Sequence, residues 1–138
     1  MAAIPQRAVG DEHTFLSAAA SAQTGKQLNV KNFRHVVVSV ATDGGGDAAL
    51  TAKCQGAIAK TAPDFSAAQA VGNMWDYIGM YDYQSGALVA GDTGFAVATA
   101  DDYRLFMVNV DGLEWLNFTV TARSEGEVTI KAVGFSNL

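Results

Sequence analysis

The sequence contains very little cysteine or histidine for a chain of 138 residues. Its single cysteine, Cys54, cannot form a disulfide within the chain, and one cysteine gives no zinc-binding spacing. Cys54 follows Leu50 and Ala52 in an alternating segment, which predicts a small buried hydrophobic side chain rather than a nucleophile. The two histidines, His13 and His35, are too isolated to indicate a His-rich metal site. We therefore expect no metal ligands and no cofactor.

Charge is also scarce. Charged residues make up 17% of the chain, against about 25% in an ordinary soluble domain. The net charge of -5 argues against the basic surface with which proteins neutralise nucleic-acid phosphates, so we expect no nucleic-acid partner. A surface of small, uncharged side chains costs little to desolvate, which favours burial against further copies of the chain or another protein. A weakly charged monomer is the alternative interpretation.

Long apolar runs and catalytic motifs are missing as well. No stretch approaches the roughly 18 apolar residues of a membrane span, and residues 1–12 lack the features of a signal peptide. We therefore expect a protein made in a cytoplasm, with no membrane partner. The sequence contains no nucleophile elbow, zinc-protease motif, P-loop or dinucleotide fingerprint. It predicts no catalytic residues, and we expect that the protein is not an enzyme.

Helical periodicity is nearly absent, and the sequence instead alternates apolar with polar residues. This pattern predicts strands at residues 14–19, 33–42, 48–58, 73–83, 94–98, 103–110, 114–123 and 127–136. The segment 33–42 is apolar on both faces near its middle, which predicts a central strand. Because no helices are available to cover a parallel sheet, we expect an all-β fold: an antiparallel two-sheet β-sandwich, jelly-roll or Greek-key-like, formed by residues 13–138 as a single domain.

The connections between these strands carry their own signals. Residues 43–47 (DGGGD) predict a hairpin connection, since glycine accepts the positive φ values that other residues resist. The alternation lapses between residues 59 and 72, and residues 61–66 are typical of a long surface connection that crosses from one sheet to the other. Residues 66–71 are compatible with one helical turn.

Residues 1–12 have no usable period and contain Pro5 and Gly10. They are expected to form an extended N-terminal arm that needs a neighbour to hold it in place. The candidate docking residues of this arm are Ile4, Pro5, Arg7 and Val9.

The conspicuous chemical cluster is aromatic. At strand periodicity Trp75, Tyr77, Tyr81 and Tyr83 share one face of the segment 73–83. Tryptophan and tyrosine combine a large apolar area with one polar group, so this stripe suits a subunit interface or a sugar-stacking platform, to which Trp115 would be added. Packing in the core is the third interpretation, and the sequence leaves all three open.

Several segments together resemble small β-sandwich structural proteins of tailed bacteriophages. The resemblance covers roughly residues 28–135 and rests on residues 33–40 (FRHVVVSV), 53–56 (KCQG), 62–66 (APDFS), 75–77 (WDY), 108–115 (VNVDGLEW) and 126–129 (GEVT). These segments are strand and turn patterns, so no functional residue is transferred individually.

The resemblance implies a virion protein, made in the bacterial host cytoplasm, that works through its surface. Its most specific implication is a head decoration (cement) protein that binds and stabilises the outer capsid shell. The implied partners are further copies of the chain, in a homotrimer or another homo-oligomer, and the major capsid protein or other virion proteins. Two alternatives are a tail, neck or fibre-base component and a carbohydrate-binding β-sandwich module.

Overall fold

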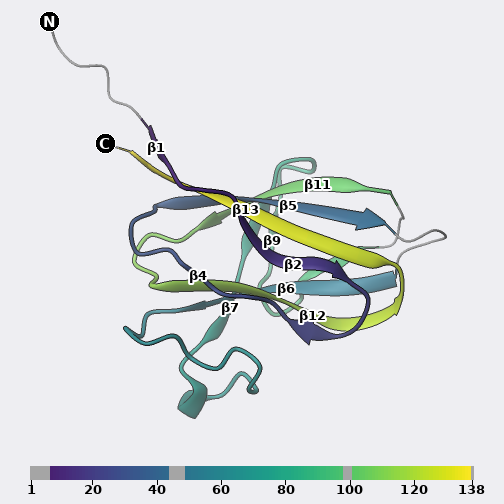
Figure 1. The fold of residues 1–138 in the computed structure, drawn as a ribbon, viewed down its shortest axis with the longest axis horizontal. Helices are drawn as coiled ribbons and strands as arrows, with labels where there is room; N and C mark the ends of the chain where they lie inside the picture. Colours follow the sequence, from purple (N-terminus) through teal and green to yellow (C-terminus); the bar gives the residue numbers. More distant parts are fainter. Residues whose placement is uncertain (1–6, 44–48, 98–100, 138) are drawn as a thin grey trace, which may run out of the picture.

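The computed structural model describes residues 7–43, 49–97 and 101–137, which form two antiparallel β-sheets packed face to face (Figure 1). Sheet A contains β1 (Arg7–Val9), β2 (His13–Ala19), β13 (Glu127–Asn137), β5 (His35–Asp43), β11 (Tyr103–Asn109), β8 (Met80–Asp82) and β9 (Leu88–Val89). Sheet B contains β10 (Phe95–Val97), β7 (Asp76–Ile78), β6 (Ala49–Ala57), β12 (Trp115–Glu125), β3 (Gln23–Thr24) and β4 (Leu28–Asn29). The predicted all-β sandwich is confirmed.

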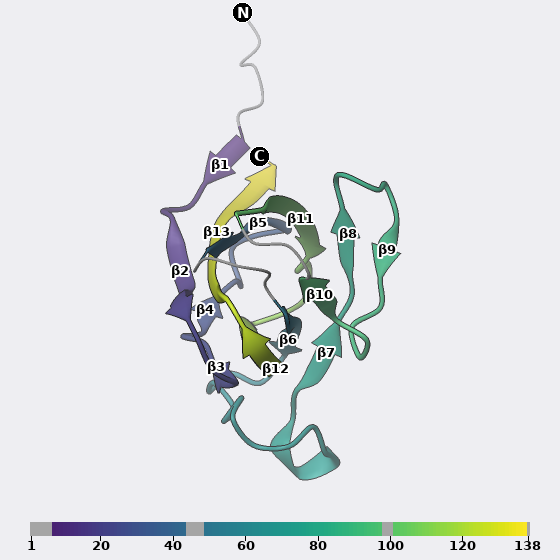
Figure 2. The same cartoon turned by 90° about the vertical axis from the view of Figure 1, so that its right-hand side faces the viewer.

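The strand order places the longest strands at the centre of each sheet. In sheet A the order is β1-β13-β5-β11-β8-β9, with β2 also paired to β13. In sheet B it is β10-β6-β12-β3, with β7 paired to β6 and β4 to β12. The segment 33–42, predicted to be central, forms β5 between β13 and β11. Seen end-on, the two sheets enclose the core, and β8 and β9 extend one edge (Figure 2).

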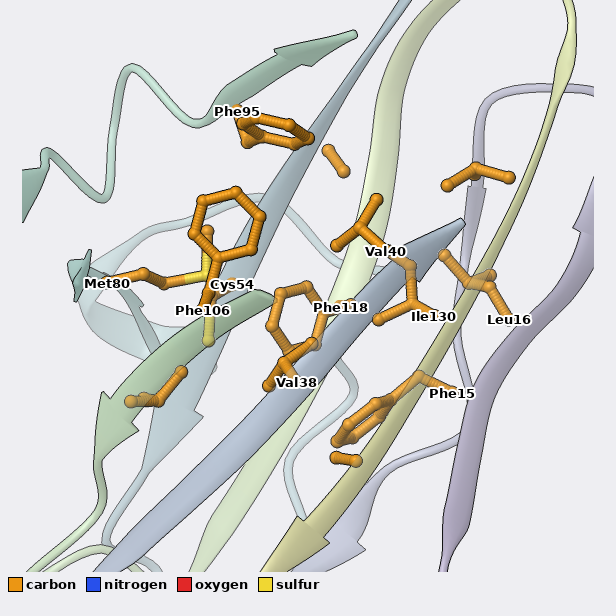
Figure 3. Close-up of a cluster of buried hydrophobic side chains, with 14 of the residues drawn as sticks. Phe15, Leu16, Val38, Val40, Cys54, Met80, Phe95, Phe106, Phe118 and Ile130 are labelled. Carbon is orange, nitrogen blue, oxygen red and sulfur yellow. The ribbon is translucent and has the colours of Figure 1, made fainter. Parts of the chain in front are cut away.

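The core lies between the sheets and follows from the alternation of the strands. Val36, Val38 and Val40 of β5 are almost completely buried, whereas the residues between them are half-buried on the opposite face. Figure 3 shows Phe106, Phe118 and Ile130 of other strands beside Val38 and Val40 in this core. Cys54 lies in the same cluster, as the sequence predicts for a small hydrophobic side chain.

Two predicted connections differ from the structure. Residues 43–47 are not a hairpin connection, because β5 pairs in sheet A while β6 pairs in sheet B; residues 44–48 themselves lie outside the described residues. The connection after β6 does not cross between the sheets, because β6 and β7 pair with each other in sheet B. A short 3-10 helix, η1 (Val71–Asn73), ends this connection, so the helical turn comes later than the predicted residues 66–71.

The predicted single strand 73–83 is two short strands in different sheets. β7 pairs with β6 in sheet B, and β8 pairs with β11 in sheet A. The chain passes from one sheet to the other at Gly79. Alternation alone could not reveal this break, because the apolar and polar positions keep the same period through both strands.

Candidate functional site

The first surface of interest is an aromatic cluster on the outer face of sheet B. It consists of Phe65, Trp75, Tyr77 and Trp115 around Ala57. Cys54 and Ala57 are three residues apart in β6, so their side chains point to opposite faces of sheet B. Because Cys54 lies in the core, the aromatic cluster lies on the face that points away from the sandwich interior. The Trp75 and Tyr77 rings are perpendicular, with centroids 5.0 Å apart.

The connection between β6 and β7 covers this face, and two buried amide side chains hold it there. Gln55 Nε2 donates a hydrogen bond of 2.9 Å to the Phe65 carbonyl oxygen, and Asn117 Nδ2 donates one of 3.3 Å to Gln55 Oε1. Both amides are essentially inaccessible to solvent. Because a buried amide must find its partners within the protein, these bonds tie the connection to the sheet.

Burial limits what the aromatic cluster can bind. Trp75 is only 6% exposed, so its ring offers almost no face on which a sugar could stack. The indole nitrogens of Trp75 and Trp115 are buried and have no hydrogen-bond partner among the described residues. Tyr77 and Trp115 are half-buried, and the Lys53 ammonium lies 4.8 Å from the centre of the Tyr77 ring. The cluster therefore works mainly as a second, smaller core beneath the connection.

An open groove of about 350 Å³ lies beside the aromatic cluster. Its wall includes three strongly exposed apolar side chains, Ile58, Val71 and Met74, together with the carboxylate of Asp76. Met74 has a φ of 60°, a left-handed conformation that is uncommon outside glycine. The Asp76 carboxylate is already engaged, since it accepts hydrogen bonds from the Tyr77 main-chain N–H and the Gln69 side chain.

The remaining aromatic residues of the predicted stripe lie on the other sheet. Tyr81 is on β8, and its ring is perpendicular to that of Tyr83, with centroids 5.5 Å apart. Tyr83 is 49% exposed. The structure thus brings Trp75, Tyr77 and Trp115 together at sheet B, and it places Tyr81 on sheet A with Tyr83 in the turn that follows β8.

The N-terminal arm is partly a strand of its own domain. Arg7, Ala8 and Val9 form β1, which pairs with Phe135–Asn137 at the end of β13. The Gly10 N–H then donates a hydrogen bond of 2.8 Å to the Gly134 carbonyl, and the Phe33 ring lies over both glycines. Arg7 and Val9 are therefore held by the chain itself, whereas Ile4 and Pro5 lie outside the described residues.

Two buried ionisable groups have a pKa that burial or hydrogen bonding shifts. Burial raises the pKa of the Cys54 thiol, which keeps it protonated and unreactive. Arg104 forms an ion pair with Asp82 at the edge of sheet A. Burial alone would raise the pKa of the Asp82 carboxyl, but hydrogen bonds from Arg104 and from the main-chain N–H groups of Gln84 and Ser85 hold it below its usual value.

The described residues contain neither a metal-binding cluster nor a membrane-spanning helix. Within residues 7–43, 49–97 and 101–137, no group of three or more His, Cys, Asp or Glu side chains is arranged to hold a metal ion. None of the helical segments in those ranges has the length and hydrophobicity needed to cross a membrane.

A feature that the sequence interpretation did not single out is the outer face of sheet A. Leu105 and Met107 of β11, Val37 of β5 and Val133 of β13 all face away from the core. The signal was present in the segment 33–42, which is apolar on both faces. That pattern predicts a central strand, but the exposure of its second face depends on what packs against it in the folded chain.

These features define a two-sheet antiparallel β-sandwich, and two solved structures share its fold. The SPBc2 prophage-derived protein YomS aligns with a TM-score of 0.65 at 18% identity, over 99% of this chain and 98% of that chain. The PBSX exported protein XepA aligns with a TM-score of 0.66 at 14% identity, over 97% of this chain. This chain spans 40% of the XepA chain. No family model and no curated protein sequence matches this chain.

Proposed function

We propose that this protein is a bacteriophage virion structural protein, and specifically a capsid decoration protein that binds and stabilises the outer head shell. The observation that carries the proposal is the end-to-end alignment with YomS, a prophage-derived protein, over nearly the whole of both chains. The second fold neighbour, XepA, also bears the name of a phage element, PBSX. We also interpret the strand order as a jelly roll, because the main connections alternate between the sheets.

The surface supports this role. A chain with 17% charged residues presents a surface that loses little hydration energy on contact with another protein. Repeated over many copies on one shell, individually weak contacts produce strong attachment, because neighbouring contacts raise the effective concentration of each other. A ligand that binds the assembled shell and not its dissociated subunits stabilises the shell by mass action. The protein would then act through contact area, without catalysis.

Of the two alternatives predicted from the sequence, the carbohydrate-binding module has less support. Sugar stacking needs an exposed aromatic face, and Trp75 is 6% exposed beneath the β6–β7 connection. The tail, neck or fibre-base alternative is compatible with the same fold and differs in the assembly that it requires, which is a ring or a tube.

Cosedimentation of the purified protein with undecorated phage capsids tests the proposal. We expect saturable binding and an increase in the temperature at which the shells disassemble. Deleting residues 1–6 leaves β1 and its pairing with β13 in place, so the variant separates the contribution of Ile4 and Pro5 from the integrity of the fold. Weaker shell binding by this variant would assign docking to the arm. Absence of binding by the complete chain, or its assembly into rings or tubes, would overturn the capsid proposal.

A further inference from the structure

The outer face of sheet A is an apolar surface that the chain itself leaves uncovered. The ladder pairings place one apolar side chain from each of five neighbouring strands in a continuous row: Val133, Val37, Met107, Tyr81 and Leu88. The next row includes Ser39 and Leu105, which face each other across β5 and β11. We call the surface formed by these rows, with Tyr103 at one end and Phe135 at the other, the sheet A face.

Several large side chains of the sheet A face are unusually exposed to solvent. Leu88 is 83% exposed, Tyr103 63% and Leu105 40%. Val9, at the edge beside Phe135, is 60% exposed. A shallow groove of about 230 Å³ on the same surface is lined by Leu105, Val133 and Phe135, and also by Lys131 and Glu12. Contiguous apolar surface of this kind marks an interaction site on a soluble protein, whereas single exposed hydrophobic residues do not.

The outer face of sheet B, in contrast, is covered by the chain itself. On sheet B the β6–β7 connection covers the outer face, with Gln55 bound to the Phe65 carbonyl. No described connection covers the corresponding part of sheet A, since Tyr103 and Leu105 remain exposed. Among the described residues, the sheet A face is therefore open to contact with another molecule.

We propose that a second copy of this chain supplies that cover, and that two copies pack sheet A against sheet A about a two-fold axis. Charge favours this partner. The outward positions of β13, β5 and β11 between Thr129 and Phe135 hold two basic side chains. Lys131 is paired with Glu12 at 3.4 Å, and His35 lies beside Phe135 at one end. A two-fold interface sets each patch against itself, so a neutral patch meets no like charge. A charged partner would need complementary charges here.

Size and composition favour the same partner. Strands β13, β5 and β11 contribute seven residues each, while the short strands β8 and β9 contribute three and two. At about 4.8 Å between strands and about 3.4 Å per residue, the flat projection of this face is roughly 400 Å². The relief of the side chains enlarges the accessible area, which brings it toward the ~800 Å² that each partner contributes to a stable complex. Tyr81, Tyr83 and Tyr103 place hydroxyl groups among the apolar residues, as is common in protein interfaces. Two such faces would pack about 10 Å apart, like the two sheets within one molecule.

The inference does not depend on the capsid proposal, and its test uses no shells. Sedimentation velocity and mass photometry of the complete chain should show a dimer. Leu105→Glu should convert it to a monomer, because the interface would bury an unpaired carboxylate, and we expect the dissociation constant to rise at least about 100-fold. Leu88→Glu, at an 83% exposed position, should also weaken the dimer without threatening the fold.

Val71→Glu is the matched control. Val71 is also apolar and fully exposed, but it lies in η1, outside the sheet A face. This variant should stay dimeric, and all three variants should unfold in urea in a single cooperative transition, which shows that each is folded. A wild-type chain that is monomeric up to about 100 μM, where even a weak micromolar complex would form, overturns the proposal. A trimer, a dimeric Leu105→Glu, or a monomer that binds capsids through Leu105 overturns it equally.

Discussion

Tyr77 and Tyr81 are four residues apart in the chain, yet they lie on the outer faces of different sheets. Tyr77 pairs with Gln55 in sheet B, and Tyr81 pairs with Met107 in sheet A. The short segment between them carries the chain from one sheet to the other. The close packing of this crossing gives a first prediction.

Gly91 makes close main-chain contact with the crossing. A Cβ atom at this position would lie 2.7 Å from the Tyr77 carbonyl carbon and 2.8 Å from the Ile78 nitrogen. Main-chain atoms cannot rotate away, so Gly91→Ala should lower the free energy of unfolding by about 1–3 kcal/mol, as measured by urea denaturation. Gly72→Ala is the control, because no heavy atom lies within 4 Å of its Cβ position, and it should not destabilise. Equal midpoints for the two variants would contradict the prediction.

The Arg104–Asp82 ion pair should contribute to stability. Arg104 is 17% exposed and Asp82 8% exposed at their side chains, and the guanidinium also lies 5.4 Å from the centre of the Phe95 ring. Arg104→Ala leaves a nearly buried carboxylate without its cation, and we expect a loss of about 2–3 kcal/mol in urea denaturation. Arg104→Lys keeps the charge but loses the planar group, so it should recover only part of the loss. Full recovery would show that charge alone matters.

The same pair predicts a dependence on pH. Because folding lowers the pKa of Asp82, its ionisation stabilises the folded state. This contribution to stability is complete above the pKa of Asp82 in the unfolded chain, which is about 4. It is lost as the pH falls through the lower pKa of Asp82 in the folded chain. Asp82→Asn should therefore be less stable than the wild-type chain at pH 7, and the difference should shrink at pH 3. A difference that is constant with pH would assign the effect to packing.

Gln55 should hold the β6–β7 connection on sheet B. Gln55→Ala removes the bond to the Phe65 carbonyl and leaves Asn117 Nδ2 without its acceptor, which should cost about 1–3 kcal/mol. Amide hydrogen exchange should accelerate mainly in residues 58–75. Gln69→Ala is the control, since Gln69 is exposed and its bond to Asp76 is 3.3 Å long, so its effect should be within about 0.5 kcal/mol. Uniform acceleration across the chain would contradict a local role.

The Cys54 thiol should not react with thiol reagents in the folded protein. Its side chain is 1% exposed, and burial raises the pKa of the thiol. A thiol reagent such as DTNB should therefore react only at the rate of global unfolding and should react fully in denaturant. Fast labelling of the native protein would mean that β6 opens locally.

The long strands were predicted well because the information for a strand is local, whereas the two-residue strands β3, β4 and β9 were not predicted. Val36, Val38 and Val40 alternate with half-exposed neighbours in β5, and this period of two is visible without any partner. The aromatic residues were predicted less well. Trp75 and Tyr77 continue the same period as Tyr81, and only the pairing of β7 with β6 and of β8 with β11 separates them.

The sequence by itself determined an all-β chain with alternating strands, one buried cysteine and few charges, because side-chain periodicity and composition belong to each segment alone. The tertiary structure decided which strands share a sheet, that Trp75 is covered by the connection before it, and that the sheet A face is left bare. These outcomes depend on pairings between segments far apart in the chain. The free energy of such pairings comes from contacts that form only when both partners are in place.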